Sequence, residues 1–313
     1  MARSSAQPTL SEEPNSQLSS STNTKQNEPR QENLKQQSIS IPQKRNAFTE
    51  LKWIAPQPKH RKVDNSKQNE TKSKHNRDFA SALLPYILHP ESFPTTTIIR
   101  KTEHTVLLRD LFPKALVHLL LLPRDPAFYG LTPFEAFNPK SPSHVAFLDM
   151  MRSEARSAAK LAASELTRLV GPHSATCKAR NNVLDTLPEP GNSSSLTEVA
   201  ADHIPPARDF IKDIRIGVHA EPSMNTLHVH IISIDSYSPA LKHKKHYNSF
   251  NSNFFVPLDD FPLAEDDERM KVEKQKEYAK GDMECWRCGK NYGNRFKELK
   301  THLEDEYHEW RSV

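Results

Sequence analysis

The sequence predicts an α+β fold built on an antiparallel sheet with flanking helices, preceded by an unpacked tail and followed by a small cysteine-containing unit. Strand-like and helix-like patterns of apolar residues follow one another in mixed order after residue 77, which is typical of α+β architecture. Only 35% of the 313 residues are hydrophobic, which is low for a fully globular chain. We therefore divide the chain into residues 1–76, 77–258 and 259–313.

Charge and cysteine usage limit the classes of function. The chain has 43 Lys and Arg against 39 Asp and Glu, a net charge of +4, so a site for a polyanion must come from local clustering. Three cysteines, two of them close together, suit a reducing compartment and a metal site better than a disulfide framework. The N-terminus lacks the apolar core of a signal peptide, and the longest apolar run, residues 119–122, is too short to span a bilayer. We expect a soluble intracellular protein that does not span a membrane.

Residues 1–76 are rich in Ser, Gln, Asn, Lys and Pro, a composition that cannot bury enough apolar area to offset chain entropy. We expect a disordered tail. Within it, Phe48, Leu51 and Ile54 fall on one helical face, which indicates either a short binding motif for a partner or a chance hydrophobic cluster. The basic run 59–62 is either a nuclear localisation signal or a solvated charge cluster.

Ordered structure is expected to begin with a short helix and a pair of strands. Apolar residues within 79–88 have helical spacing, and Pro85 predicts that the helix starts or restarts there. The apolar runs 106–109 and 116–122 flank a turn in which Pro113 fixes the φ angle. These runs are therefore expected to be two strands joined by that turn.

Two features of the next segment each allow two interpretations. His118, inside the second apolar run, is either a core histidine hydrogen-bonded to backbone or part of a site. Residues 144–170 have the longest helical pattern, and Arg152, Arg156 and Lys160 recur every four residues on one of its faces. That face is either a solvated helix surface or a stripe that contacts phosphates.

The most informative stretch is a predicted antiparallel strand pair, residues 211–219 and 227–234, joined by a turn. Polar and apolar residues alternate from Thr226 onward, which places His228 and His230 on the same face of the second strand. Two imidazoles roughly 6.8 Å apart along a strand suit either catalysis or a metal site.

Two segments after the loop expected at residues 186–198 complete the central region. Residues 242–250 mix Lys and His with aromatic residues, a composition that suits nucleic acid because cations meet phosphates and rings stack on bases. Acidic residues at 259–268 are expected to open a helix that continues to about residue 279, with lysines toward its end.

The C-terminal unit carries a metal-ligand pattern. Two residues separate Cys285 from Cys288, and thirteen residues separate Cys288 from His302. This spacing is a strong zinc-finger signal, because the cysteines sit on a tight turn and a helix presents the other ligands. Glu306 is four residues after His302 and projects beside it on a helix, whereas His308 is six residues on. Both remain open as the fourth ligand.

Four pieces of the sequence resemble, in the same order, the histidine-triad (HIT) domain and C-terminal finger of the aprataxin family. They are residues 110–118, 217–233, 244–250 and 285–302. The likeness covers roughly residues 77–313 and implies a HIT-like sheet in a short form of the family without the forkhead-associated domain. The first histidine of the triad is replaced by Thr226, whose backbone carbonyl is expected to orient the middle histidine equally well.

The resemblance implies a hydrolase that removes AMP from DNA 5′-phosphates after aborted ligation, in single-strand break repair. His228 would attack the α-phosphorus to give a histidine-AMP intermediate, which water hydrolyses. The resemblance further implies a structural zinc, no catalytic metal, nicked or double-stranded DNA with 5′-adenylated ends as the partner, a nuclear location, and a repair partner for the tail. Two rivals remain: a HIT-family hydrolase of small nucleotides, and a DNA-end-binding protein whose catalysis is impaired by Thr226.

The resemblance also assigns individual residues. His230 would hold non-bridging oxygens, Lys114 and Ser223 would stabilise the pentacoordinate charge, and His118 would support the nucleophile strand. The expected catalytic residues are His228, His230, Lys114, Ser223 and His118. The expected substrate-binding residues are Phe112, Asp110, Lys244, Lys245 and His246, with Phe112 against the adenine or the terminal base pair. The expected metal ligands are Cys285, Cys288, His302 and Glu306, with His308 as the alternative.

Overall fold

The computed structural model describes residues 80–186 and 204–313 of the chain. The predicted tail, with its motif at Phe48, Leu51 and Ile54 and its basic run 59–62, lies outside these residues, as does most of the predicted loop 186–198. Among the helices of the two described ranges, none combines the length and the apolar character that crossing a membrane requires.

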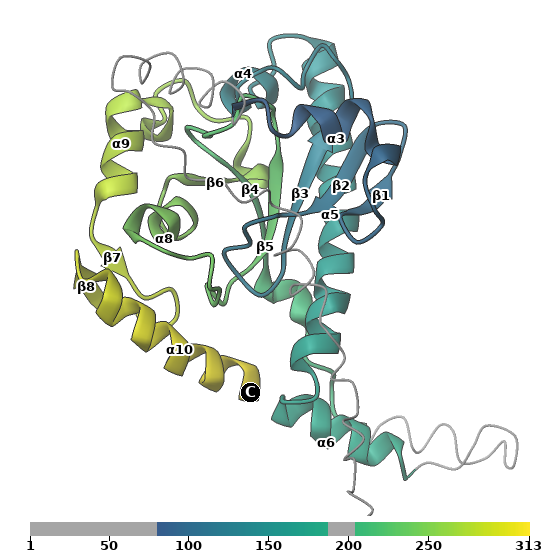
Figure 1. Ribbon diagram of the computed structural model, residues 1–313, viewed down its shortest axis with the longest axis vertical. Helices are drawn as coiled ribbons and strands as arrows, with labels where there is room; N and C mark the ends of the chain where they lie inside the picture. Colours follow the sequence, from purple (N-terminus) through teal and green to yellow (C-terminus); the bar gives the residue numbers. More distant parts are fainter. Residues whose placement is uncertain (1–79, 187–203) are drawn as a thin grey trace, which may run out of the picture. The chain divides into compact units, whose positions relative to one another are not determined.

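The fold is built on a six-stranded antiparallel sheet with the strand order β1-β2-β3-β5-β4-β6 (Figure 1). Its strands are β1 Ile98–Lys101, β2 Thr105–Arg109, β3 His118–Pro123, β4 Ile214–His219, β5 Val229–Ser233 and β6 Phe255–Pro257. The predicted α+β class is confirmed, and both predicted strand pairs form, β2 with β3 and β4 with β5. Strands β1 and β6 have only 4 and 3 residues, too few for a diagnostic alternation, and were not predicted.

One face of the sheet packs against α5 (Pro142–Val170), the helix predicted for residues 144–170. Leu227, Val229 and Ile231 belong to the main core beneath this helix. The polar residues that alternate with them therefore point to the opposite face of the sheet. Direct pairing of β3 with β5 brings distant parts of the chain together on that opposite face.

The shorter helices agree with the prediction only in part. Helix α3 (Leu84–Leu88) has a proline in its first turn, as predicted. Helices α4 (Pro133–Phe137) and α6 (Ala175–Leu184) were not predicted. In α4 a capping box between Thr132 and Glu135 satisfies the first backbone N–H groups, which stabilises a helix of only 5 residues.

The predicted helix at 259–279 is wrong in its first half, because α9 begins only at Val272 and spans Val272–Lys280. The acidic residues before it form two short 3-10 turns, Leu258–Asp260 and Glu268–Met270. Asp267 caps the second turn by accepting a hydrogen bond from the backbone N–H of Arg269. Acidic residues here thus belong to short local turns, one of which Asp267 caps at its start, instead of opening one long helix.

The C-terminal unit, called the finger below, consists of β7 (Met283–Glu284), β8 (Asn291–Gly293) and α10 (Phe296–Ser312). Helix α10 places Tyr307 and Trp310 in the main core. The Tyr307 ring also stacks on Tyr237, with 4.0 Å between ring centroids. The finger is therefore packed against the sheet rather than merely tethered to it.

Candidate active site and metal centre

Four histidines lie together at the sheet face opposite α5. His118 begins β3, His219 ends β4, His228 immediately precedes β5, and His230 lies within β5. The ring of His230 is central, with centroids at 5.1 Å from His118, 4.4 Å from His219 and 4.8 Å from His228. His118, His228 and His230 are buried. The predicted shared face of His228 and His230 is thus joined by two more imidazoles, and these four residues are called the histidine cluster below.

The hydrogen-bond network assigns proton positions to the rings of His118 and His230. The backbone N–H of Lys114 donates to Nδ1 of His118 at 3.3 Å, so the proton of this ring is on Nε2. That Nε2 donates to Nδ1 of His230 at 2.9 Å, which places the proton of His230 on its own Nε2. Within the described residues His230 Nε2 has no hydrogen-bond partner. The ring of His230 therefore retains an unpaired N–H donor.

His228 has the geometry of a nucleophile. Its Nδ1 lies 2.7 Å from the backbone carbonyl oxygen of Thr226, so Nδ1 carries the proton and Nε2 keeps a free lone pair. His228 and His219 both line a cavity of about 410 Å³, whose other walls include the start of α4, the turn between β4 and β5, and α9. The carbonyl of Thr226, and not its side chain, performs the orienting role that was expected at this position.

Burial keeps the histidine cluster neutral. Burial lowers the pKa of His118 to about 4, although the neighbouring Asp110 carboxylate opposes the shift. Burial also lowers the pKa of His228, and lowers the pKa values of His219 and His230 well below the usual 6.5. At pH 7 the imidazoles are therefore uncharged, which is the state in which a nitrogen lone pair can attack phosphorus.

The two predicted charge-stabilising residues lie in different surroundings. Lys114 precedes β3, and its Nζ donates to the backbone carbonyl of Phe112, while burial lowers the pKa of its ammonium group. Ser223 is exposed in the turn between β4 and β5. The backbone N–H of Lys114 is hydrogen-bonded to His118 of the cluster. Ser223 lies on the turn that leads into His228.

The turn before β3 presents an exposed apolar surface. Asp110 Oδ1 accepts a hydrogen bond from the backbone N–H of Phe112 at 2.7 Å, and Asp110 Oδ2 lies 3.4 Å from His118 Nδ1. The side chains of Leu111 and Phe112 are 57% and 58% exposed. An exposed aromatic ring on a turn anchored to the cluster is available to a flat apolar group such as a base.

The basic aromatic segment forms helix α8 (Lys244–Asn251). Lys245 is exposed near its N-terminal end, and Lys244 Nζ donates to the side-chain oxygen of Asn294 in the finger. His246 Nδ1 accepts a hydrogen bond from the backbone N–H of Lys242 at 3.2 Å. Cations are therefore displayed beside the finger, as a phosphate-binding surface requires.

The prediction that the rings of this segment stack on bases is wrong for Tyr247 and Phe250, because both are buried in the fold. Phe250 instead packs against the histidine cluster. Both Phe250 and His219 escaped the functional assignment from sequence. Residue 219 lies two positions after Gly217, which pairs with His230. The alternation along the first strand, which puts residues 217 and 219 on one face, was the available signal for His219.

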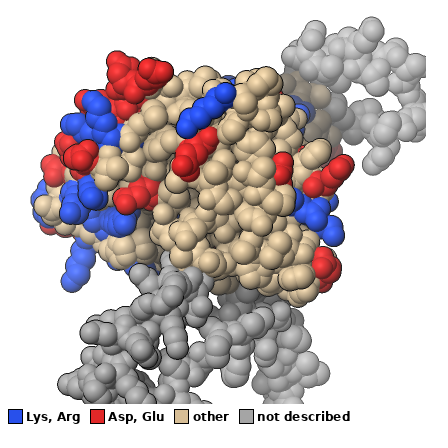
Figure 2. Space-filling model, turned by 90° about the horizontal axis from the view of Figure 1, so that it is seen from above, with Lys and Arg blue, Asp and Glu red and all other residues tan. Residues whose placement is uncertain are grey.

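The suggested phosphate stripe on α5 is not supported. Arg156 pairs with the carboxylate of Asp259 at 2.8 Å, and Arg152 donates to the backbone carbonyl of Asp259 at 3.2 Å. These two guanidinium groups fasten the segment after β6. On the face seen in Figure 2, basic and acidic side chains lie next to one another toward the edges, with a largely uncharged area between them. No single-sign patch marks that face.

The finger holds a second cluster of ligand atoms. One ligand atom each from Cys285, Cys288, His302 and Glu306 lies within 4.8 Å of every other. Cys288 Sγ approaches His302 Nε2 to 3.1 Å, and His302 Nε2 lies 3.0 Å from Glu306 Oε1. Two thiols, an imidazole and a carboxylate at such separations fit tetrahedral zinc. His308 is exposed and outside this group, so the geometry favours Glu306 as the fourth member.

Asp110, His118 and His230 also offer ligand atoms within 4.8 Å of one another. In this group, however, the nitrogens of His118 and His230 are joined directly by the 2.9 Å hydrogen bond. This contact explains their proximity without an ion between them.

Comparison with known families finds two matches. Residues 251–309 match a family described as C2HE / C2H2 / C2HC zinc-binding finger, and residues 194–246 match one described as scavenger mRNA decapping enzyme C-term binding. The first match covers the four-ligand cluster. The second includes His219, His228 and His230.

Similar proteins and solved structures cover most of the chain. An aprataxin-like protein of Schizosaccharomyces pombe is 33% identical over 234 residues, which are 75% of this chain and 84% of that protein. An aprataxin-like protein of Saccharomyces cerevisiae is 32% identical over 227 residues, 72% of this chain and 94% of that protein. A crystal structure of the aprataxin orthologue Hnt3 in complex with DNA has 32% identity and a TM-score of 0.55, covering 74% of this chain and 96% of that one.

Proposed function

The chain belongs to the family of aprataxin-like proteins, and from that premise we propose that it is a DNA 5′-adenylate hydrolase. The observation that carries the proposal is the state of His228. Its Nδ1 is fixed on the Thr226 carbonyl, its Nε2 keeps a free lone pair, and the residue lines a cavity. A solved relative that is described as bound to DNA supports DNA as the substrate.

The reaction proceeds in two displacements on one phosphorus. In the first, Nε2 of His228 bonds to the α-phosphorus of the adenylate, and the bond from that phosphorus to the oxygen of the DNA 5′-phosphate breaks. DNA leaves with a free 5′-phosphate, which needs no strong acid to depart. In the second, water attacks the histidine-AMP phosphorus, releasing AMP and restoring the imidazole.

The neighbours of His228 supply donors for the charge that develops on phosphorus. Two hydrogen bonds, from Lys114 N–H to His118 Nδ1 and from His118 Nε2–H to His230 Nδ1, hold the His230 ring with its Nε2–H free. A donor fixed in advance stabilises a transition-state oxygen without reorganisation. The ammonium group of Lys114 and the hydroxyl of Ser223 are assigned the remaining non-bridging oxygens, and Phe112 and Asp110 are assigned the nucleoside of AMP.

The finger is assigned a structural zinc and a share in DNA binding. Cys285, Cys288, His302 and Glu306 would hold the ion, which when bound organises the turn and helix of the finger. Lys244, Lys245 and His246 are assigned to the DNA backbone beside it. We assign the protein to nicked DNA in single-strand break repair, because abortive ligation at nicks produces this substrate. We assign it a nuclear location, where DNA is repaired.

Turnover of a 5′-adenylated nicked duplex tests the proposal. We expect AMP release by the wild-type protein, loss of it in His228→Ala, and little change in the control His104→Ala, which alters an exposed histidine. Turnover of a dinucleoside polyphosphate with no turnover of the duplex would favour a small-molecule hydrolase. Duplex binding without AMP release from either substrate would favour a DNA-end-binding protein.

A further inference from the structure

Helix α8 lies between the six-stranded sheet and strands β7 and β8 of the finger (Figure 1) and contacts β6 on one side and β7 on the other. On the cluster side, Phe250 meets three imidazoles edge to face. Its ring centroid lies 5.2 Å from that of His118, 4.6 Å from that of His219 and 5.1 Å from that of His230. Because these contacts depend on ring geometry, the position of α8 sets how the three imidazoles are held.

On the finger side, α8 is bonded to the backbone around the first cysteine. The hydroxyl of Tyr247 donates to the carbonyl of Glu284 at 2.7 Å and accepts from the N–H of Trp286 at 3.0 Å. These two residues flank Cys285, which belongs to the same buried cluster as the Tyr247 ring. One buried hydroxyl thus makes two hydrogen bonds to the turn that bears a metal ligand.

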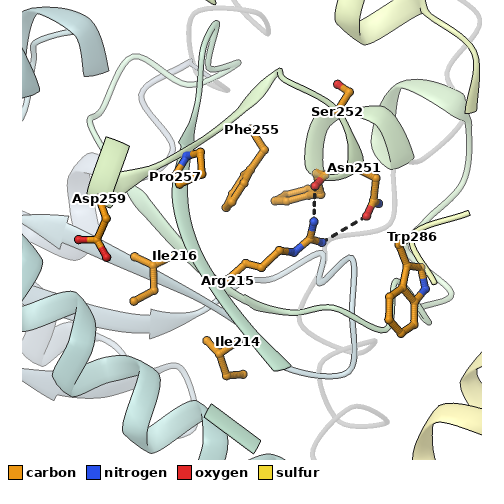
Figure 3. Close-up of a pocket in the computed structure, with 10 residues that line it drawn as sticks. Ile214, Arg215, Ile216, Asn251, Ser252, Phe255, Pro257, Asp259 and Trp286 are labelled. Carbon is orange, nitrogen blue, oxygen red and sulfur yellow. Dashed lines mark hydrogen bonds between the residues drawn. The ribbon is translucent and has the colours of Figure 1, made fainter. Parts of the chain in front are cut away.

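Packing alone does not fix the C-terminal end of α8. A cavity of about 600 Å³ opens there between β4, the last turn of α8 and Trp286 (Figure 3). Arg215 reaches across this space from β4 and donates to the backbone carbonyl of Phe250 at 2.7 Å and to Asn251 Oδ1 at 3.3 Å. Atoms that face a cavity lack contacts that resist displacement, so the hydrogen bonds of Arg215 help to hold this end of the helix. Asn248, which donates to the backbone carbonyl of Gly281 at 2.7 Å, and Asn251, which donates to Ser236 Oγ at 3.1 Å, anchor α8 together with Tyr247.

We propose that α8 transmits the order of the metal-bearing turn to the histidine cluster, with Tyr247 as the positioning residue and Phe250 as the contact. The inference rests on the proposed adenylate hydrolase and extends it. The finger then has a role beyond gripping DNA. Its metal-bearing turn sets the rate of AMP transfer to His228 even for a substrate too small to touch the finger.

The test uses Tyr247→Phe in the full chain, which keeps the buried ring and removes the hydroxyl. Tyr237→Phe is the control, because Tyr237 also joins sheet and finger, through its ring stacked on Tyr307, but is not part of α8. Single-turnover formation of the histidine-AMP adduct is measured on the adenylated nicked duplex and on a dinucleoside 5′,5′-diphosphate. Zinc per chain and affinity for unadenylated nicked DNA are measured in parallel.

We expect Tyr247→Phe to retain zinc and DNA affinity while adduct formation slows about tenfold on both substrates, the equivalent of about 1.4 kcal/mol. Tyr237→Phe should match the wild type. Chelation of zinc should slow the wild type on the small substrate and add little to the slowing in Tyr247→Phe.

Two results overturn the inference: wild-type rates in Tyr247→Phe, or chelation that affects only the duplex. A wild-type protein that forms no adduct from either substrate refutes the proposed hydrolase instead, which separates the two failures.

Discussion

Acidification tests the claim that the histidine cluster is buried and neutral. In the folded protein burial lowers the pKa of His118 from 6.5 to about 4. Above pH 6.5 the imidazole is neutral in both states, so it makes no pH-dependent contribution. As pH falls below 6.5, the unfolded chain binds a proton that the folded chain does not, and stability is lost until the folded pKa is reached. The cost from His118 alone is about 2 kcal/mol at pH 5 and about 3 kcal/mol near pH 4.

His219, His228 and His230 act in the same direction, because burial lowers their pKa values too. The free energy of unfolding should therefore fall steeply between pH 6.5 and 4, as measured by urea denaturation at a series of pH values. His118→Gln should reduce the slope between pH 6 and 5 by roughly 1 kcal/mol per pH unit.

Replacement of the exposed His104 by Gln is the control and should leave the slope nearly unchanged. An unaltered slope in His118→Gln would mean that the His118 imidazole takes up its proton equally in both states. That outcome would refute the assignment of a neutral, buried relay.

Two further predictions concern the finger and the basic end of α8. Cys288→Ser and Glu306→Ala should each lower the bound zinc below one ion per chain and destabilise the finger. His308→Ala should retain the ion. Equal losses of zinc in Glu306→Ala and His308→Ala would contradict the assigned ligand set. Replacing Lys244 and Lys245 together by Ala should weaken duplex binding and reduce the magnitude of the slope of log affinity against log salt by up to about 1.8, as expected for two lost phosphate contacts. An unchanged slope would place the DNA elsewhere.

The sequence was sufficient for features that depend on local periodicity and spacing. The alternation from Thr226 onward identified which side chains in and just before β5 face the core, and Leu227, Val229 and Ile231 are there. The cysteine and histidine spacing identified the finger, because metal geometry constrains ligands over a short stretch of chain. Helical spacing also placed α5 within two residues of its observed start.

The sequence was insufficient where long-range packing decides the outcome. Periodicity says which face His228 occupies but not what covers that face, so the burial of Tyr247 and Phe250 in α8 was missed. His219 enters the cluster only through the pairing of β4 with β5, whose register a single strand does not reveal. The charges of Arg152 and Arg156 were visible, but their partner Asp259 lies far along the chain.

The most direct test of the account is the location of the covalent intermediate. The protein is mixed with a 5′-adenylated nicked duplex, quenched within one turnover, and digested for peptide mass spectrometry. The account predicts AMP on the peptide that contains His228, attached to the His228 imidazole, and no adduct in His228→Ala. An adduct on another residue, or one that persists in His228→Ala, would contradict the assignment of His228 as the nucleophile.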